Sequence, residues 1–305
     1  MASTLCSRYC RGYWSNAMYA KPGMLNWKIC RKISKRGSIM KNNETDHAGI
    51  ILVTGAGSGI GRAIVLNQAK QNKAVVIADI NLQAAQMVRQ EALAAGALDA
   101  LAVECDVGNE ASIMAAFRRC KAHLGDIPTG IVANAGIEIV KRAHETTLEE
   151  WERVIRTNLT GTFLTCREAI RHLLEQNKPG AIICISSPSA FVGFAAGSNS
   201  AYGSSKGGIS ALVRALSIDY ADDMIRVNGV VPGATATSLL NVTLSHPSNK
   251  AFSERVKEQI PLRRLATPEE VGNTVSWLLS EQASYVTGTH IFVDGGLTAR
   301  GANDF

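Results

Sequence analysis

The sequence predicts an α/β fold in which one doubly wound parallel sheet of about seven strands carries helices on both faces. Short apolar runs alternate with helical patterns from residue 50 onward, which is the order of parallel strands joined by crossover helices. The runs are apolar throughout, as expected for strands that are covered on both faces. A glycine-rich segment directly follows the first run, where such a fold turns from strand into helix.

Each strand is predicted from a short apolar run and each helix from the longer pattern between two runs. The strands are expected at residues 50–53, 74–78, 100–104, 130–133, 181–185, 226–231 and 290–293. The helices are expected at residues 60–71, 82–95, 110–123, 148–176, 202–220 and 268–280. Two of these helices have marked starts, because Thr147 precedes Glu150 and Thr267 precedes Glu270 with the spacing of a capping box. Since no repeat or linker-like tract interrupts the order, residues 40–305 are predicted to form a single domain.

In the turn after the first predicted strand, every second residue from Gly55 to Gly61 is a glycine. Glycines at a strand-to-helix turn allow a tight bend and a close approach of the backbone to a pyrophosphate, which then sits at the helix N-terminus. The spacing here is G-x-x-x-G-x-G rather than G-x-G-x-x-G. The alternative is a glycine-rich loop that binds no ligand. We predict a dinucleotide-binding turn formed by Gly55, Gly57, Ser58, Gly59, Ile60 and Gly61.

Asp79 closes the second predicted strand, 18 residues after Gly61. A carboxylate at this place accepts hydrogen bonds from the adenosine ribose hydroxyls and repels a 2′-phosphate. The glycine turn holds no basic residue before Gly59, and the aspartate is followed by Ile80. We therefore predict NAD as the cofactor in preference to NADP. A second role for Asp79, as the cap of the next helix, is compatible with this one.

Tyr202 and Lys206 are four residues apart, so they share one face of a predicted helix. A free tyrosine has a pKa of about 10 and is a poor base at neutral pH. A lysine ammonium beside it favours the phenolate by charge attraction, which would let the phenol act as an acid/base near pH 7. A Tyr-x-x-x-Lys pair alone often occurs by chance. Its position downstream of the glycine turn is what makes it indicate a catalytic pair.

Seven segments in register resemble the short-chain dehydrogenase/reductase family, over about residues 50–297. They are Thr54-Gly55-x-x-x-Gly59-Ile60-Gly61, Asp106-Val107, Asn134-Ala135-Gly136, Asn158, Ser186-Ser187, Tyr202-x-x-x-Lys206 and Pro232-Gly233-x-x-x-Thr237. The resemblance implies a Rossmann-like fold. It also implies hydride transfer between a nicotinamide cofactor and a secondary alcohol or ketone.

By this resemblance, four residues are expected to be catalytic. Tyr202 would transfer a proton to or from the substrate oxygen, and Ser187 would orient and polarise that oxygen. Lys206 would lower the tyrosine pKa and bond the nicotinamide ribose. Asn158 would hold a water that links Lys206 to solvent, or would be an ordinary polar residue of its helix.

The resemblance assigns further residues to the cofactor. Asp106 and Val107 would contact the adenine. The sheet beside the cofactor would be stabilised by Asn134, Ala135 and Gly136. The nicotinamide carboxamide would be held by Pro232, Gly233 and Thr237.

The catalytic serine departs from the family pattern. The family's usual spacing is the 13 residues that separate Ser189 from Tyr202, whereas Ser187 lies 15 residues before the tyrosine. Ser187 is preferred because it ends an apolar strand and leaves Gly193 where the family's next glycine is expected. The two extra residues would lie in residues 194–201, and Ser189 stays the alternative.

The positive charge of the chain lies in its first part. The formal net charge is +6, yet residues 1–50 hold nine Lys or Arg against two acidic residues, so the other 255 residues carry −1. The predicted domain therefore shows no sign of a nucleic-acid-binding surface. Residues 1–39 are assigned to a basic leader that precedes the catalytic domain of residues 40–305.

Three interpretations of the leader stay open. Its composition fits an organelle-targeting peptide, although it lacks a clean amphipathic repeat and the apolar stretch of a secretory signal. It could instead be upstream sequence read from a mis-assigned start, because Met40 and the residues after it resemble a natural beginning. It could also be a disordered tail. The localisation is predicted to be cytoplasmic, with organelle targeting as the alternative.

The seven cysteines form no C-x-x-C pair, and no His/Cys cluster has zinc spacing. We predict a reducing compartment, no disulfide and no metal site. No stretch is long and apolar enough to predict a membrane span. The predicted helices 148–176 and 202–220 are long and apolar, and relatives commonly associate through them, so a homotetramer is expected.

The predicted function is that of an NAD-dependent oxidoreductase that interconverts a secondary alcohol and a ketone, with Tyr202 as acid/base. One alternative is an inert NAD-binding sensor or scaffold, and another is an NADPH-linked 3-oxoacyl reductase. The small-molecule substrate is expected to contact residues 138–142, 188–201 and 234–261. Glu138 would bind a substrate hydroxyl or amine there, or would be an exposed charge without such a role.

Overall fold

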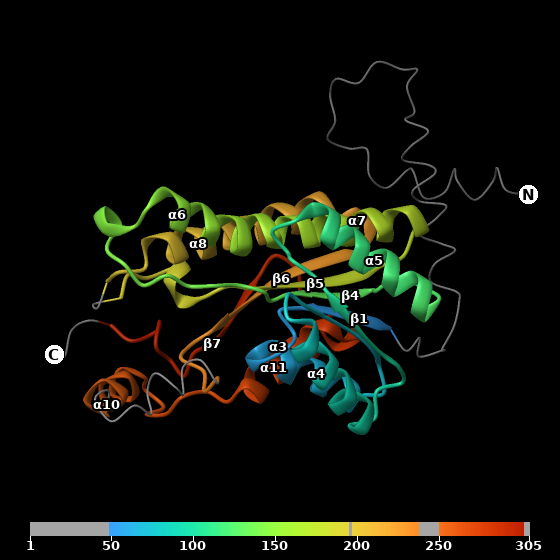
Figure 1. The fold of residues 1–305 in the computed structure, drawn as a ribbon. Helices are drawn as coiled ribbons and strands as arrows, with labels where there is room; N and C mark the ends of the chain where they lie inside the picture. Colours follow the sequence, from blue (N-terminus) through green and yellow to red (C-terminus); the bar gives the residue numbers. More distant parts are fainter. Residues whose placement is uncertain (1–48, 195–196, 238–249, 302–305) are drawn as a thin grey trace, which may run out of the picture. The chain divides into compact units, whose positions relative to one another are not determined.

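Seven parallel strands form one sheet in the order β3-β2-β1-β4-β5-β6-β7 (Figure 1). This computed structural model describes residues 49–194, 197–237 and 250–301, and the predicted leader lies outside them. The strands are β1 (Ile50–Thr54), β2 (Ala74–Asp79), β3 (Ala100–Glu104), β4 (Gly130–Ala133), β5 (Gly180–Ile185), β6 (Ile225–Pro232) and β7 (His290–Val293). The predicted doubly wound, Rossmann-like sheet of seven strands is confirmed.

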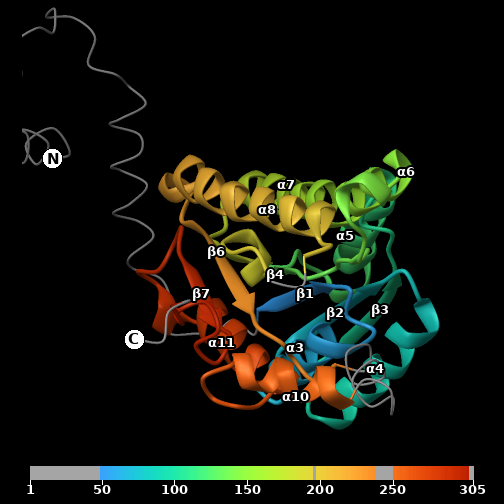
Figure 2. The same cartoon turned by 90° about the vertical axis from the view of Figure 1, so that its left-hand side faces the viewer.

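Helices cover both faces of the sheet (Figures 1 and 2). One face carries α5 (Glu110–Leu124), α7 (Gly161–Gln176) and α8 (Ser200–Asp219); the other carries α3 (Gly59–Ala69), α4 (Leu82–Ala94) and α11 (Pro268–Leu279). Successive strand residues point to opposite faces, so Leu52 and Ile182 join one core cluster while Val53 and Ile183 join the other. This double covering is why the strands read as unbroken apolar runs.

The strand order reverses between β3 and β4. β1 pairs with β2 on one side and with β4 on the other, so the strands from β4 onward extend the sheet in the opposite direction. In open α/β sheets the carboxyl ends of the strands at such a point form a crevice that binds ligands. The glycine turn follows β1 and Asn134 follows β4, so both lie at this place.

The predicted helix over residues 148–176 is confirmed in its bounds, but its pitch changes within it. α6 (Leu148–Val154) and α7 are separated by a π-helical turn, Ile155–Thr160. A π turn has i→i+5 hydrogen bonds and is found mostly as a single turn, frequently at functional sites. Apolar spacing alone does not distinguish it from a regular helix, because the pattern continues on both sides.

The two predicted capping boxes are both present. Thr147 accepts a hydrogen bond from the Glu150 N–H at the start of α6, and Thr267 accepts one from the Glu270 N–H at the start of α11. The sequence pattern did not predict α10 (Lys250–Gln259), which follows the undescribed residues 238–249. Among the described residues, no helix is long and apolar enough to cross a membrane.

Candidate active site

The glycine turn is built for close backbone approach. Gly55 and Gly59 have φ angles of +61° and +54°, in the left-handed region that favours glycine. A Cβ on Gly55 would lie 2.8 Å from the Ala135 Cα, and one on Gly57 would lie 2.9 Å from the Asp79 Oδ2. Ser58, at the N-cap of α3, makes no capping hydrogen bond with its side chain. The helix N-terminus therefore offers backbone donors to an anion, which fits the predicted pyrophosphate.

Gly61 tolerates no side chain, although it lies in the first turn of a helix. A Cβ there would lie 2.2 Å from the Gly55 carbonyl oxygen and 2.7 Å from the Asn134 Nδ2. We expect Gly61→Ala to lower the free energy of unfolding by roughly 1–3 kcal/mol, because the turn must shift to make room. Gly207 in α8 is the matched control, since a Cβ there meets nothing within 4 Å.

Urea unfolding followed by circular dichroism measures both glycine variants. Gly207→Ala should raise the free energy of unfolding by about 0.5–1 kcal/mol, the ordinary gain of alanine over glycine in a helix. Equal effects of the two substitutions would contradict the tight packing of the turn.

Asp79 is fixed beside the glycine turn. Its Oδ2 accepts a hydrogen bond from the Gly57 N–H at 2.8 Å, and its Oδ1 accepts one from the Asn81 N–H at 2.9 Å. Asn81 caps α4, so the cap of this helix comes from the asparagine rather than from Asp79. Ile80 is 69% exposed at the same place. The carboxylate is thus held at the end of β2, next to the turn predicted to bind the pyrophosphate.

Asn134 joins the end of β4 to the glycine turn. Its Nδ2 donates to the carbonyl oxygens of Thr54 and Gly55, at 2.9 and 3.0 Å. The Thr54 hydroxyl accepts hydrogen bonds from the N–H groups of Asn134 and Ala135, at 3.0 and 3.2 Å. This arrangement agrees with the predicted stabilising role of residues 134–136, and it adds Thr54 as their partner.

The remaining cofactor candidates lie around the same edge of the sheet. The Asp106 side chain accepts a hydrogen bond from the Gly108 N–H at 2.9 Å, and Val107 is buried against Gly161 at the start of α7. Pro232 ends β6, and a Cβ on Gly59 would lie 3.2 Å from the Thr237 Cγ2. The segment after β6 therefore reaches the glycine turn.

Tyr202 and Ser187 meet at the carboxyl end of β5. The Ser187 side chain hydrogen-bonds the Tyr202 side chain, while its Oγ also lies 3.3 Å from the Ser189 Oγ. Ser189 receives a further hydrogen bond from the Asn199 Nδ2 at 3.1 Å. The geometry thus supports Ser187 as the serine next to the tyrosine, with Ser189 behind it.

Burial controls the protonation of Tyr202 and Lys206. It raises the pKa of Tyr202 to about 12, against the hydrogen bond from Ser187, which lowers it. It lowers the pKa of Lys206 to about 8. The Lys206 Nζ donates to the Ile185 carbonyl oxygen at 2.8 Å and lies 5.6 Å from the centroid of the Tyr202 ring. The pKa of the tyrosine therefore lies above its ordinary value, contrary to the expected lowering by Lys206.

Asn158 lies fully buried in the π-helical turn between α6 and α7. Its Oδ1 accepts a hydrogen bond from the Ile137 N–H at 2.8 Å, and its Nδ2 donates to the Ile137 carbonyl oxygen at 2.9 Å. The Nδ2 also donates to the Ser205 Oγ at 3.0 Å, and Ser205 donates to the Tyr202 carbonyl oxygen. Asn158 therefore joins the segment after β4 to the helix that carries Tyr202 and Lys206.

Comparison with known proteins matches this arrangement to a family. A family model described as enoyl-(acyl carrier protein) reductase matches residues 55–298. The chain is 38% identical to 3beta-hydroxysteroid dehydrogenase 1 of Eggerthella lenta, over 81% of this chain and 93% of that protein. The chain belongs to the short-chain dehydrogenase/reductase family.

Two further comparisons show the range of this family. Glucose 1-dehydrogenase 2 of Bacillus subtilis is 37% identical, over 81% of this chain and 93% of that protein. The crystal structure of 3-ketoacyl-(acyl-carrier-protein) reductase from Brucella melitensis complexed with NADH is 31% identical, with a TM-score of 0.74, over 82% and 98% of the two chains. The protein is thus a short-chain dehydrogenase/reductase acting on CH–OH groups with a nicotinamide cofactor.

Several residues of this short-chain dehydrogenase/reductase site were given no role by the sequence, although Thr54 stands in the first matching segment. Thr54, Ser205 and the Ile185 carbonyl oxygen each satisfy a partner at the site. Thr54 stands directly before the glycine turn and Ser205 directly before Lys206. Their position next to a motif was the one feature of the sequence that could have indicated a role at the site. The described residues contain no group of three or more His, Cys, Asp or Glu side chains that could hold a metal ion.

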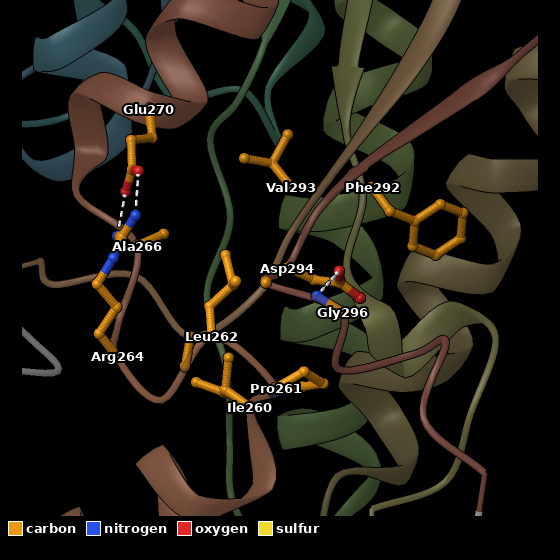
Figure 3. A pocket seen from close by; sticks show the side chains of 12 residues that line it. Ile260, Pro261, Leu262, Arg264, Ala266, Glu270, Phe292, Val293, Asp294 and Gly296 are labelled. Carbon is orange, nitrogen blue, oxygen red and sulfur yellow. Dashed lines mark hydrogen bonds and ion pairs between the residues drawn. The ribbon is translucent and has the colours of Figure 1, made fainter.

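A separate cavity of about 440 Å³ lies beside the end of β7 (Figure 3). Its lining includes Ile260 and Leu262, and Arg264 makes a two-pronged ion pair with Glu270 at its edge. The four catalytic candidates do not line it. Asp294, which lines this cavity, packs against Gly233, one of the residues predicted to hold the nicotinamide carboxamide. A Cβ on Gly233 would lie 2.7 Å from the Asp294 Cα.

Proposed function

We propose that this protein is an NAD-dependent dehydrogenase/reductase that interconverts a secondary alcohol and a ketone, with Tyr202 as acid/base. The carrying observation is the Tyr202 phenol, hydrogen-bonded to Ser187 and placed beside the buried Lys206 ammonium. These groups lie at the carboxyl ends of the strands, on the same edge of the sheet as the glycine turn. A proton-transferring group and a dinucleotide site on one sheet edge suit hydride transfer to or from carbon.

Each side chain then has a distinct role in oxidation. Bound NAD⁺ supplies the hydride acceptor. The Tyr202 Oη, as phenolate, takes the proton of the substrate hydroxyl, and the Ser187 Oγ donates a hydrogen bond to the same oxygen. Lys206 lies 5.6 Å from the ring centroid, where its positive charge would favour the phenolate against the burial that raises the pKa of Tyr202. In reduction the same groups act in reverse, and Tyr202 returns the proton to the alkoxide oxygen.

NAD is proposed over NADP because of Asp79. Its carboxylate is held beside the turn by Gly57 and Asn81, where it would meet the ribose hydroxyls and repel a 2′-phosphate. The relative from Brucella melitensis, complexed with NADH, supports this choice. The NADPH-linked 3-oxoacyl reductase is the second candidate, since that same relative is a 3-ketoacyl-(acyl-carrier-protein) reductase.

Replacing Asp79 tests the choice of cofactor. We expect Asp79→Ala with Ile80→Arg to shift the ratio of kcat/KM for NAD over NADP by roughly tenfold or more towards NADP, the effect of one removed repulsion and one gained ion pair. Steady-state kinetics with both cofactors measures this ratio. Asp223→Ala, which removes one negative charge as Asp79→Ala does but in the short helix before β6, is the control and should leave the ratio unchanged. An unchanged ratio in the double variant would contradict the proposal.

The proposed activity is tested by the absorbance of reduced nicotinamide. The purified protein is incubated with NAD⁺ or NADP⁺ and secondary alcohols of cyclic, polyol, steroid and hydroxyacyl classes. Formation of NADH with one class supports the proposal. A preference for NADPH with a 3-oxoacyl thioester, run in the reductive direction, would favour the second candidate. Cofactor binding without turnover of any class would favour the inert sensor or scaffold.

We further propose a homotetramer that associates through α7 and α8. These helices, together with the π-helical turn before α7, expose a shared apolar surface that includes Leu159, Phe163 and Leu212, and the Phe163 side chain is 41% exposed. Such contiguous apolar surface marks a contact between proteins. Light scattering coupled to size-exclusion chromatography measures the stoichiometry, and a monomer would contradict the proposal.

A further inference from the structure

The hydroxyl of Ser187 makes three hydrogen bonds, although it has only one proton to donate. Its Oγ donates to the Ser189 Oγ at 3.3 Å, accepts from the Ser189 N–H at 3.2 Å, and hydrogen-bonds the Tyr202 side chain. A serine hydroxyl has one donor and two acceptor lone pairs. In the proposed mechanism that proton turns to the substrate oxygen, so the bond to the Ser189 Oγ must then break or reverse its direction.

Asn199 decides between these two outcomes. Its Nδ2 donates to the Ser189 Oγ at 3.1 Å, and an amide nitrogen cannot accept a hydrogen bond in return. The Ser189 Oγ thus accepts from both Asn199 and Ser187, while no acceptor among the described residues takes its own proton. That proton is therefore ready for Ser187 as soon as the Ser187 proton turns to a substrate.

The backbone holds Ser189 and Asn199 against the start of the helix that carries Tyr202. Ser189 lies in η3 (Pro188–Ala190), which follows β5, and a Cβ on Gly203 would lie 3.2 Å from the Ser189 carbonyl oxygen. The Asn199 carbonyl oxygen accepts the Gly203 N–H at 2.8 Å. Because Gly203 is the residue after Tyr202, both residues are tied to the backbone that positions the tyrosine.

We propose that Ser189 and Asn199 are positioning residues, which form a hydrogen-bond relay that supports Ser187 during the reaction. When the Ser187 proton turns to the substrate oxygen, the Ser189 hydroxyl rotates and donates to the Ser187 Oγ, while Asn199 continues to donate to Ser189. No proton leaves its oxygen, because only the direction of each O–H bond changes. This inference rests on the proposed function, since it takes Ser187 as a group that meets the substrate oxygen.

The relay should act mainly in the transition state. Negative charge builds on the substrate oxygen as its proton leaves, and a donor such as Ser187 stabilises that charge. A hydroxyl whose oxygen accepts a hydrogen bond is itself a stronger donor, because hydrogen bonds in a chain polarise one another. Loss of the relay should therefore lower kcat and leave KM for NAD unchanged.

Substitutions at the two positions test the relay by steady-state kinetics. Ser189→Ala removes the hydroxyl, and we expect it to lower kcat roughly threefold to tenfold, the effect of one hydrogen bond. Asn199→Asp replaces the donating amide by a carboxylate, which only accepts and so draws the Ser189 proton away from Ser187. This variant should lower kcat by at least as much. Asn199→Ala, which removes the donor without adding a charge, should lower kcat in the same direction.

A double variant separates the relay from the added charge. Once Ser189→Ala has removed the hydroxyl, the carboxylate has no proton to redirect, so adding Asn199→Asp should change kcat by less than about twofold. Adding Asn199→Ala should likewise have little effect. The values are compared at pH values where kcat no longer rises, so that a change in the pKa of Tyr202 does not enter.

Asn273→Asp is the matched control. Asn273 is exposed on α11, and its Oδ1 accepts a hydrogen bond from the Asn67 Nδ2 at 2.8 Å. An aspartate can also accept this bond, so the substitution adds the same charge without reversing a donor. It should leave kcat unchanged.

The outcomes distinguish this inference from the proposed function. If the unaltered protein forms NADH, the relay is overturned by an unchanged kcat in Ser189→Ala. Equal losses from Asn199→Asp with and without the Ser189 hydroxyl, or a parallel rise in KM for NAD, would also overturn it, and in each case the proposed function stands. Absence of NADH formation from every class of alcohol would remove the proposed function, and the relay with it.

Discussion

Replacing Tyr202 with phenylalanine should lower kcat by roughly 10²–10⁴-fold, the contribution of a positioned acid/base. The ring remains and so does its packing, but the Oη that exchanges a proton with the substrate is gone. Cofactor binding should be nearly unchanged, because the glycine turn and Asp79 lie on other elements. Steady-state kinetics and a titration of NAD by protein fluorescence measure the two quantities separately.

Tyr285→Phe is the control for this variant. Tyr285 is fully exposed, at 103% of its reference area, so loss of its hydroxyl should leave both quantities unchanged. Activity of Tyr202→Phe within a few-fold of the unaltered protein would remove Tyr202 from the proposed mechanism. Loss of NAD binding in parallel would indicate a structural role instead.

Replacing Lys206 with methionine should have two opposite effects: turnover is lost and the protein becomes more stable. The folded-state pKa of Lys206 is about 8, below its ordinary 10.5, because the ammonium is buried. This depression corresponds to about 3 kcal/mol of penalty below pH 8. The hydrogen bond to Ile185 offsets about 1 kcal/mol of it. We therefore expect a gain of about 2 kcal/mol at neutral pH.

The pH dependence gives the sign of this effect. Between the folded and unfolded pKa values the unfolded chain binds more protons at this lysine, so the stability of the unaltered protein rises with pH across that window. The advantage of the methionine variant should consequently shrink as the pH approaches 10. Urea unfolding at neutral pH and near pH 10 measures it. Lys70→Met, on an exposed lysine at the end of α3, should change stability by less than about 0.5 kcal/mol. Destabilisation by Lys206→Met at both pH values would contradict the argument.

The sheet could be predicted nearly residue by residue because both of its faces are buried. Strands such as β3 and β4 have the bounds that the sequence predicts, and β6 extends one residue further at each end. The start of α11 was equally readable, since Thr267 and Glu270 satisfy the first turn with their own side chains. Local chemistry fixes these features, so a single sequence contains the information.

The protonation of the candidate site could not be predicted from motifs. The spacing of Tyr202 and Lys206 correctly places the lysine beside the ring, yet the pKa of each group is set mainly by burial. The extent of burial depends on β5 and on the segment after β4, which are distant in the sequence. The sequence left Glu138 open as an exposed charge, and it is exposed; its charge raises the pKa of both Tyr202 and Lys206, with a smaller effect than burial.

α10 was missed for a different reason. Its sequence, Lys-Ala-Phe-Ser-Glu-Arg-Val-Lys-Glu-Gln, carries few apolar residues, so it lacks the apolar content by which the other helices were predicted. The predicted substrate-contacting segment 234–261 overlaps it, and residues 238–249 of that segment lie outside the described residues.

The π-helical turn at Ile155–Thr160 lets the direction of the Asn158 side chain and the core-facing side of α7 be set independently, which one regular helix would not allow. Each residue of a regular helix advances by a fixed angle, so turning Asn158 towards Ile137 would also rotate every residue after it. The wider turn absorbs one residue and resets the phase, which leaves Leu164 and Leu173 of α7 directed at the core. Substitutions that alter how α7 packs on the sheet can therefore occur without changing the direction of the Asn158 side chain.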